Sequence, residues 1–269
     1  MTPASPRFPA IGGCAGVANP QIPQYMRLKV IIVGSNGRIG GAVASRFAAS
    51  ADFSVVALDR AALPLDDPAA VAERLKQHDF DVLVNTAAIT SVDACEEDPS
   101  AAWRVNAEAP AVMAGVCRDI GARMIHLSTD YVFDGAAHTP YRETDPTNPQ
   151  SIYGSTKLAG EKAVFQEAHS ATIIRTSWRY SAHGNNFLKT MRRLGTERKS
   201  LGVIFDQIGT PTYAGDLADA IISILPQIKH KNKEIYHFSN EGVSSWYDFA
   251  VAIMDLSDIN CKIDPLETK

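Results

Sequence analysis

Hydrophobic residues recur along most of the chain in short blocks, and segments with helical spacing separate these blocks. The block LKVIIVG, which begins at Leu28, is followed by GGAVASRFAAS with helical spacing and then by the block FSVVALD. The alternation continues with blocks at DVLVNTAA, ARMIHLST and SATIIRTSW, and with helical segments at DPAAVAERLKQH, within Asp98–Arg118 and at Tyr153–Glu167. Strands that alternate with helices predict a parallel sheet. Because the strands are apolar throughout, helices should cover both faces of that sheet.

Beyond Ser181 the pattern is less regular. Helical spacing recurs at NNFLKTMRRLG, DLADAIISILP and SSWYDFAVAIMDL, and short strands are expected at LGVIF and EIYHFS. We therefore expect an α/β fold, with a Rossmann-like doubly wound parallel sheet over residues 27–180. A smaller C-terminal substrate lobe should follow over residues 181–269, interleaved with the end of the sheet and covering its cleft.

Residues 1–26 differ from the rest because they are rich in proline and show neither helical nor alternating spacing. They lack the charged start and apolar run of a secretory signal. We expect a disordered tail, or a start codon upstream of a true start at Met26. A transit peptide is disfavoured because this segment holds a single arginine, Arg7.

Composition narrows the class of protein. Hydrophobic residues make up 45% and charged residues 21%, which is typical of a globular protein with a sizeable core. The net charge of −4 gives no reason to expect nucleic acid or an anionic membrane as a partner. No apolar run reaches the roughly 18 residues of a membrane span. The cysteines are far apart, which predicts reduced thiols in the cytoplasm and no disulfide or zinc site: Cys14, Cys95, Cys117 and Cys261.

The segment GSNGRIG directly follows the first predicted strand and precedes a helix, with Gly34, Gly37 and Gly40 in a G-x-x-G-x-x-G pattern. Glycines here let the backbone approach a pyrophosphate, and the helix N-terminus directs free N–H groups at its charge. The turn predicts a dinucleotide site, with a plain glycine-rich loop as the alternative.

Two neighbours at the end of the second predicted strand give opposite indications about the cofactor. Asp59 could accept hydrogen bonds from an adenosine ribose, which favours NADH. Arg60 could meet a 2′-phosphate, which favours NADPH. The choice between NADPH and NADH stays open, and a surface ion pair between the two side chains is a third interpretation.

Tyr153 and Lys157 in YGSTK are spaced so that both side chains lie on one face of a helix. A free tyrosine, with a pKa of about 10, is a poor acid at neutral pH, but a nearby lysine stabilises its phenolate. The pair suits a group that protonates the alkoxide formed by hydride transfer to a carbonyl, and the lysine could also hold the nicotinamide ribose. Upstream of this pair, Ser128 and Thr129 lie at a strand end, where α/β sheets place ligands, and could offer hydroxyls to the same oxygen.

Together these segments resemble the extended short-chain dehydrogenase/reductases, and within them the dTDP-4-dehydrorhamnose reductases. The resemblance rests on segments in family order that cover most of residues 28–250: VIIVGSNGRIG, DVLVNTAAITSVDACEED, HLSTDYVFDG, YGSTKLAGEKAV, IIRTSWRYSAHGNNFLKTM, DQIGTPTYAGDLA and YHFSNEGVSSWYDFA. STDYVFDG, RTSW and DQxGxPT are much more specific than YxxxK or the glycines.

The resemblance implies an NAD(P)H-dependent reductase of a nucleotide-linked 4-keto-6-deoxysugar, most directly dTDP-4-dehydro-L-rhamnose, in the synthesis of cell-surface polysaccharide. It implies a catalytic triad of Thr129, Tyr153 and Lys157, with Tyr153 as the proton donor. The implied cofactor contacts are Gly34, Asn36, Gly37, Arg38, Ile39, Gly40, Asp59, Arg60, Leu65, Ala87, Ala88, Thr90, Tyr153 and Lys157. The implied substrate contacts are Ser128, Thr129, Tyr131, Tyr153, Asn186 and Trp178, which would stack on the deoxysugar. Asn106 matches a family asparagine whose role could be packing, capping or catalysis.

The chain departs from the family at three places. Pro64 precedes Leu65, where the family commonly has an acidic residue. Ala42 and Gly215 stand where some members carry glutamates that bind magnesium between subunits, so we expect no metal there. The sequence stops at DPLETK, where members continue into a segment that helps to close the sugar site, so we expect a truncated lobe.

Two alternatives remain open at this point. The β regulatory subunit of methionine adenosyltransferase resembles the same family, so a non-catalytic NADP-binding subunit is one of them, although Thr129, Tyr153 and Lys157 are all present. A related nucleotide-sugar reductase or epimerase is the other. For the reductase, the expected partners are a dTDP-linked nucleotide-sugar substrate and a second copy of the chain in a homodimer, with no nucleic acid and no membrane.

Overall fold

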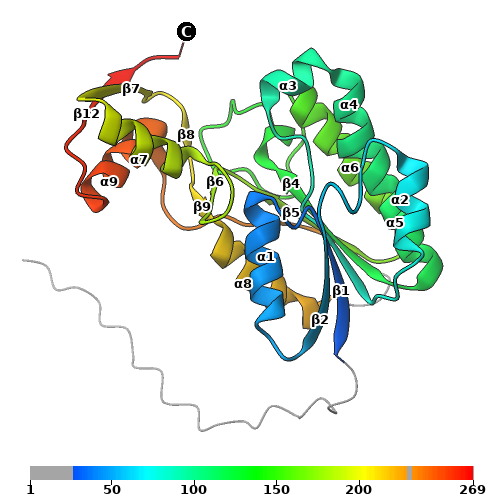
Figure 1. Ribbon diagram of the computed structural model, residues 1–269. Coiled ribbons are helices and arrows are strands. Elements are labelled where there is room, and N and C mark those ends of the chain that lie inside the picture. The colour runs from blue at the N-terminus through cyan, green and yellow to red at the C-terminus, as the bar shows by residue number, and fades with distance from the viewer. Residues whose placement is uncertain (1–26, 229–231, 269) are drawn as a thin grey trace, which may run out of the picture.

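A six-stranded parallel sheet forms the centre of the computed structural model, which describes residues 27–228 and 232–268 (Figure 1). The tail expected over residues 1–26 lies outside this range. The strand order is β10-β5-β4-β3-β1-β2, and every neighbouring pair is parallel. The strands are Leu28–Val33 (β1), Phe53–Leu58 (β2), Val82–Asn85 (β3), Arg123–Thr129 (β4), Ala171–Thr176 (β5) and Lys233–His237 (β10).

Helices cover both faces of the sheet, because the inner strands are apolar on both sides. Every residue of β3 and β5 is buried. One face packs against Arg38–Ala48 (α1) and Ala214–Ile224 (α8), and the other against Pro68–Leu75 (α2), Ala109–Ile120 (α5) and Ile152–Glu167 (α6). The doubly wound fold predicted from the strand pattern is confirmed.

Local signals set where these helices begin. Asp67 caps α2 by accepting hydrogen bonds from the N–H groups of Ala69 and Ala70, and Pro68 occupies the first helical position. The segment before α5 is divided into Val92–Glu97 (α3), Pro99–Trp103 (α4) and the π-helical turn Arg104–Glu108 (η1). Asp98 ends α3 and caps α4 by accepting from the N–H of Ala101. Short 3-10 turns follow β4 at Asp130–Val132 (η2) and α8 at Leu225–Gln227 (η3).

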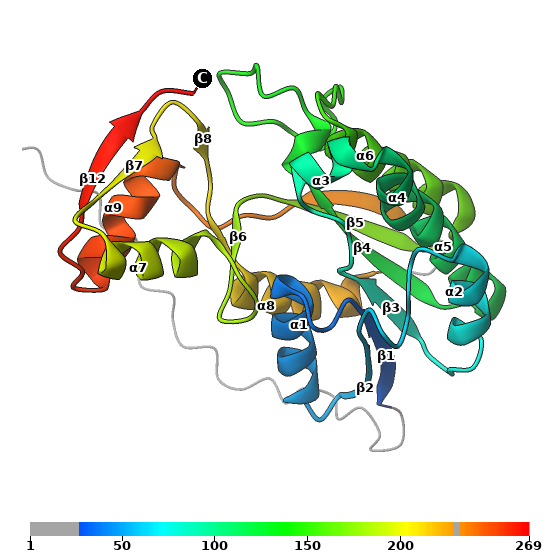
Figure 2. The same ribbon diagram turned by 45° about the horizontal axis from the view of Figure 1, so that its top comes forward.

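A smaller lobe lies beside the carboxyl ends of the strands (Figures 1 and 2). Phe187–Glu197 (α7) and Trp246–Leu256 (α9) pack on a parallel pair of strands, Ser200–Ile204 (β7) and Lys262–Leu266 (β12), around a separate apolar core. Between these elements the chain returns to the sheet, where α8 packs on α1 and β10 pairs with β5. Short strand pairs connect the two parts: Arg179–Tyr180 (β6) with Thr212–Tyr213 (β9), and Ile208–Gly209 (β8) with Ser244–Ser245 (β11).

The order of the strands determines where a ligand can enter. The chain passes from β1 outward to β2 and then returns to β3 on the other side of β1. The connections after β1 and β3 therefore diverge and leave a crevice at the carboxyl ends of these strands. The glycine turn after β1 borders this crevice.

Candidate active site

The glycine turn holds the start of α1 against the loop that follows β3. Gly34 has φ +82°, and a Cβ there would lie 2.9 Å from the backbone of Ala87. A Cβ on Gly40 would lie only 2.0 Å from the carbonyl oxygen of Gly34. No side chain caps the N-terminus of α1, whose N-cap is Gly37. This uncapped helix end can present its N–H groups to an anion, as a pyrophosphate site requires.

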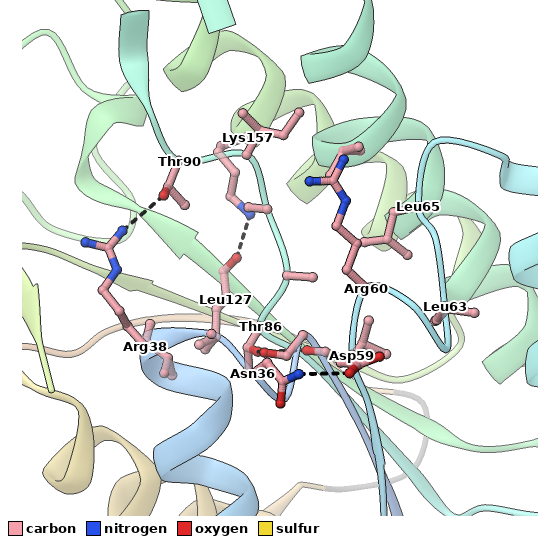
Figure 3. Close-up of a pocket in the computed structure, with 18 of the residues that line it drawn as sticks. Asn36, Arg38, Asp59, Arg60, Leu63, Leu65, Thr86, Thr90, Leu127 and Lys157 are labelled. Atoms are coloured by element: carbon pink, nitrogen blue, oxygen red, sulfur yellow. Dashed lines mark hydrogen bonds between the residues drawn. The ribbon is translucent and has the colours of Figure 1, made fainter. Parts of the chain in front are cut away.

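A cavity of about 370 Å³ lies over this turn (Figure 3). It contains nearly all the residues implied for the cofactor, and they come from the ends of β1, β2, β3 and from α6. They are Gly34, Asn36, Gly37, Arg38, Ile39, Asp59, Arg60, Leu65, Ala87, Ala88, Thr90, Tyr153 and Lys157. Gly40 is not part of the lining, since it supports the turn from behind. The sequence did not single out Leu63, Thr86, Ile89 and Val105, which also line it.

Asp59 organises the end of β2. One carboxylate oxygen accepts hydrogen bonds from the N–H groups of Ala61 and Ala62, and the other accepts from Asn36 Nδ2 at 2.8 Å. Asp59 therefore ties the glycine turn to the loop after β2. Arg60 lies beside it on the cavity wall (Figure 3). Both side chains line the cavity, so the geometry keeps both cofactor choices open.

Asn106, in the π-helical turn η1, fixes the loop after β3. Its Oδ1 accepts from the N–H of Ile89 at 2.9 Å, and its Nδ2 donates to the carbonyl of Ile89 at 3.0 Å and to Thr156 Oγ1 at 3.2 Å. Asn106 is fully buried. Its amide thus links a cavity-lining loop to the helix that carries Tyr153, and this contact accounts for the π turn at a functional site.

Tyr153 and Lys157 lie one turn apart on α6 and face the cavity. Tyr153 is 2% exposed, and its hydroxyl has no hydrogen-bond partner within the described residues. A buried hydroxyl without a partner is costly unless a ligand satisfies it. Lys157 Nζ donates to the carbonyl oxygen of Leu127 at 2.7 Å (Figure 3). Burial lowers the pKa of Lys157 to about 7, with Glu161 opposing this shift and Arg179 adding to it.

A second cavity of about 160 Å³ adjoins the first and shares Tyr153, Arg38, Thr90 and Arg179 with it. Its remaining lining is largely aromatic: Val92, Thr129, Asp130, Tyr131, Trp178, Tyr180, Phe187, Trp246 and Phe249. Aromatic walls with a few polar groups suit a sugar ring. Tyr153 therefore stands where a cofactor-sized cavity meets a smaller, sugar-sized one.

The structure places Thr129 and Tyr131 at the start of this second cavity. The Thr129 hydroxyl donates to Asp130 Oδ1 at 3.0 Å and accepts from the N–H of Tyr131 at 3.3 Å. The ring of Tyr131 meets that of Tyr153 edge-on, with the ring centres 5.4 Å apart. Burial raises the pKa of Asp130, although Thr129 and Arg179 partly oppose this shift.

Trp178 has a strained backbone with φ +41°. Such strain persists only where the surroundings fix it, and it often marks a functional position. One face of the indole stacks on Trp246 of α9, with ring centres 3.6 Å apart and planes within 8°. A Cβ on Gly209 would lie 2.4 Å from Trp178 Cε2. Trp178 therefore reaches the sugar-sized cavity, but Trp246 already covers one of its faces.

Two residues expected at the substrate have their polar groups engaged elsewhere. Ser128 reaches the larger cavity, but its hydroxyl donates to Glu161 at 2.5 Å, and the Glu161 carboxylate also pairs with Arg175 at 2.7 Å. Asn186 lines neither cavity. It caps α7 by accepting from the N–H of Lys189 and donates its Nδ2 to the carbonyl of Ser181.

Arg179 is the main residue that the sequence analysis missed. It follows β5 and lines both cavities beside Tyr153. Its pKa is raised: burial lowers it, but the neighbouring Tyr153, Asp130 and Tyr131 outweigh burial. Its guanidinium is near the Tyr153 hydroxyl without forming a well-aligned hydrogen bond. The only sequence signal was its place just beyond a strand's carboxyl end, where ligands bind.

Comparison with known proteins identifies the family. The family model described as RmlD substrate binding domain matches residues 28–269. The chain belongs to this family. Among curated relatives, the spore coat polysaccharide biosynthesis protein SpsK of Bacillus subtilis is 39% identical over 241 residues, which is 90% of this chain and 83% of the relative. A dTDP-4-dehydrorhamnose reductase of Burkholderia thailandensis is 40% identical over 84% of this chain and 78% of its own.

Solved structures of family members agree with this fold. A dTDP-4-dehydrorhamnose reductase of Clostridium acetobutylicum has a TM-score of 0.85 and 39% identity, covering 90% of this chain and 84% of its own. A dTDP-4-dehydrorhamnose reductase of Bacillus anthracis in complex with NADP has a TM-score of 0.85 and 34% identity, with 90% and 85% covered. The resemblance to the dTDP-4-dehydrorhamnose reductases stated from the motifs is confirmed.

Other features of the described residues complete the site. Cys95, Cys117 and Cys261 are buried free thiols, and Cys14 lies outside this range. Residues 27–228 and 232–268 hold no group of histidine, cysteine, aspartate or glutamate side chains placed to bind a metal ion. No helix in the same ranges is long and apolar enough to cross a bilayer.

Proposed function

We propose that this protein is an NAD(P)H-dependent oxidoreductase that reduces a nucleotide-linked 4-keto-6-deoxysugar, most directly dTDP-4-dehydro-L-rhamnose, to dTDP-L-rhamnose for polysaccharide synthesis. Family relatives named for this reaction, and one of them in complex with NADP, support the proposal. The observation that carries it is the buried Tyr153 hydroxyl at the junction of the two cavities, which has no well-aligned hydrogen-bond partner among the described residues.

The proposed mechanism assigns each group one task. A bound NAD(P)H would supply the hydride that C4 of the keto sugar accepts. Tyr153 donates its hydroxyl proton to the C4 oxygen as negative charge develops there. Lys157, one turn along α6, lies where its Nζ can stabilise the phenolate and hold a ribose hydroxyl. Thr129 orients the sugar oxygen from the other cavity wall, and Arg179 places a positive charge beside it.

Binding is divided between the two cavities. The uncapped start of α1 would hold the pyrophosphate of the cofactor, while Asp59 and Arg60 would meet its adenosine ribose. The second cavity would hold the deoxysugar against Tyr131 and Trp178. Fixing both partners in a near-attack geometry lowers the barrier before any proton moves.

The direct test is an assay with enzymatically prepared dTDP-4-dehydrorhamnose, in which oxidation of NADPH and of NADH is followed together with formation of dTDP-rhamnose. We expect turnover that depends on the sugar. The preferred cofactor will show whether Arg60 or Asp59 dominates at the ribose. Tight cofactor binding with no sugar reduction would instead favour the non-catalytic subunit, which the retention of Thr129, Tyr153 and Lys157 argues against.

Tyr153→Phe removes only the acidic hydroxyl. We expect kcat to fall by about 10²- to 10⁴-fold, the usual contribution of general acid catalysis. The dissociation constant for NADPH should change little because the ring remains. Tyr141→Phe is the control, since its hydroxyl bonds to Asp134 away from both cavities and its loss should leave kcat unchanged. A wild-type kcat in Tyr153→Phe would show that Tyr153 is not the proton donor.

We further propose that the protein works in the cytoplasm, which the free thiols of Cys95, Cys117 and Cys261 support. A homodimer is the assembly we expect, and sedimentation equilibrium would distinguish it from a monomer.

A further inference from the structure

Lys157 ends a chain of buried polar side chains that leads from the cavity into the sheet. Its Nζ lies 3.3 Å from Nε2 of His126 on β4, and Nδ1 of His126 lies 3.1 Å from Nδ2 of Asn85 on β3. Asn85 and His126 are 0% exposed and Lys157 is 2% exposed. Because Asn85 and His126 are sealed from water, the donors and acceptors along this row of side chains must match one another.

A backbone hydrogen bond fixes the orientation of the Asn85 side-chain amide. The backbone N–H of Ala87 donates to Asn85 Oδ1 at 3.0 Å, and a backbone N–H can only donate. The other end of the amide, Nδ2, must therefore face His126. Turning the amide over would set its NH₂ group against the Ala87 N–H and leave two buried donors opposed.

This orientation determines the tautomer of His126. Asn85 Nδ2 is a donor, so Nδ1 of His126 must accept and carries no proton. Burial, the larger cause, holds the pKa of His126 well below its usual value, so the ring is neutral whether or not Lys157 is charged. A neutral imidazole without a proton on Nδ1 carries it on Nε2. The Nε2–H then points at Lys157 Nζ.

An ammonium group cannot accept this hydrogen bond, because it has three N–H donors and no lone pair. A neutral amine can. It has one lone pair for the His126 Nε2–H and two N–H groups, one of which donates to the carbonyl of Leu127 at 2.7 Å. The other is left for the cavity. Each hydrogen bond from Asn85 through His126 to Lys157 then joins one donor to one acceptor.

The charges around Lys157 come from several elements. Tyr153 precedes it by one turn of α6, and Arg179 faces it from β6. Glu161 follows it by one turn, but that carboxylate is already paired with Arg175 of β5 and accepts from Ser128 of β4. A nearby guanidinium and an occupied carboxylate leave little to stabilise a positive charge on Nζ.

We propose that His126, oriented by Asn85, is a positioning residue that holds Lys157 as a neutral amine in the cofactor-free protein, and that cofactor binding is coupled to uptake of one proton at Lys157. The proton comes from solvent. Nζ then turns from Nε2 toward the ribose hydroxyls, and the negative pyrophosphate in the same cavity stabilises the new charge. The ammonium is thus in place when Tyr153 gives up its proton.

The proton count of binding tests the proposal directly. NADH is titrated into the protein by calorimetry at pH 8.0 in phosphate and in Tris, whose ionisation enthalpies differ. We expect uptake of about one proton per NADH at pH 8.0 and much less at pH 6.0, where Lys157 is already protonated. NADH is preferred to NADPH because it lacks the 2′-phosphate, whose pKa of about 6 would add its own protons.

Two variants test whether the hydrogen bonds of Asn85 and His126, and not burial alone, keep Lys157 neutral. Asn85→Asp keeps an oxygen for the Ala87 N–H and places another opposite Nδ1, so the proton moves to Nδ1 and Nε2 accepts from an ammonium. His126→Phe removes the donor to Nζ. Both should reduce proton uptake at pH 8.0 to less than half. His138→Phe is the control, because His138 is exposed and lines neither cavity, and this variant should leave the uptake unchanged.

The proposal rests on the cofactor site of the proposed function but not on its sugar substrate. The ¹⁵Nζ resonance of Lys157, assigned against Lys157→Met, should report an amine at pH 8.0 without any cofactor. An ammonium signal there would overturn the inference even if the reductase assay succeeds. Equal observed heats of binding in the two buffers, once heats of dilution are subtracted, would show that no proton is taken up and would overturn it as well. Proton uptake that neither variant changes would also overturn it.

Discussion

Two basic side chains, Lys157 and Arg179, line the cavity beside the proposed proton donor Tyr153, and they differ in character. Lys157 is buried, with its pKa lowered to about 7 chiefly by burial. Arg179 keeps its charge at all working pH values, since neighbouring groups outweigh its burial and raise its pKa. The lysine can therefore change its charge during the catalytic cycle, whereas the arginine supplies a constant field.

Arg179→Gln should lower kcat on the order of 10²-fold, because it removes a fixed positive charge from the oxygen on which negative charge develops. NADPH affinity should change little. Arg179→Lys should recover part of the loss. Steady-state kinetics with the keto sugar measure this effect, and Arg193→Gln on the surface of α7 serves as the control. An unchanged kcat would remove Arg179 from the reaction.

Lys157 should also make stability depend on pH. Its pKa is about 7 in the folded protein and near the ordinary lysine value of 10.5 in the unfolded chain. Between these values the unfolded chain binds the proton more tightly, so the free energy of unfolding rises with pH, by at most about 1.4 kcal/mol per pH unit. The penalty is complete below pH 7 and disappears toward pH 10.5.

Lys157→Met removes this penalty. The variant should therefore gain most over the wild type at pH 6.5 and progressively less up to pH 9 in urea unfolding. A constant difference across this range would show that burial of Lys157 carries no such cost.

Helix α6 connects the site to the loops around it. It carries Tyr153 and Lys157, and Gly160 brings it against the π-helical turn η1: a Cβ on Gly160 would lie 2.2 Å from the carbonyl oxygen of Asn106. Asn106 in turn fixes Ile89 beside the cofactor cavity. A displacement of α6 would therefore move the proposed catalytic pair and the cavity wall together.

Gly160→Ala should destabilise the fold by about 1–3 kcal/mol, the usual cost of overpacking, and weaken cofactor binding. Gly115→Ala in α5 is the matched control, because its Cβ would have no neighbour nearer than 3.8 Å. That variant should be neutral or stabilising by up to about 1 kcal/mol through helix propensity. Urea unfolding and NADPH titration measure both effects. Equal stabilities would contradict the close contact.

Much of this arrangement can be predicted from local sequence. The features that cannot be predicted depend on contacts between residues far apart in the sequence. Blocks such as LKVIIVG and caps such as Asp67–Pro68 predict strands and helix starts because the cause lies within a few residues. The π turn at Arg104–Glu108 depends on Asn106 meeting Ile89 and Gly160, which spacing does not reveal. Likewise, no local pattern predicts that Ser128 donates to Glu161 or that Trp178 stacks on Trp246.

The whole molecule joins the sheet, which carries the proposed nucleotide site, to the lobe, which we propose covers the sugar. Each part has its own apolar core. Trp178, just after β5, and Trp246, at the start of α9, stack across the boundary between them. Both line the sugar-sized cavity, so the position of the lobe and the shape of that cavity are set by the same contact.

Trp246→Leu should lower kcat/KM for the keto sugar by about tenfold, which corresponds to roughly 1.4 kcal/mol, while leaving NADPH binding intact. Trp103→Leu is the control, because Trp103 is 41% exposed and lines neither cavity. Kinetics with the sugar, together with cofactor titration, separate the two cavities. A loss shared equally by both ligands would mean that the stack supports the fold as a whole.

The Trp178–Trp246 contact also gives the protein an optical signature. Of its three tryptophans, two have rings 3.6 Å apart and nearly parallel, which is close enough for their electronic transitions to couple. Their exciton signal in circular dichroism reports the separation between sheet and lobe at the point where the sugar enters. Lobe movement during turnover can therefore be followed in real time by stopped-flow spectroscopy, without attaching a dye to the protein.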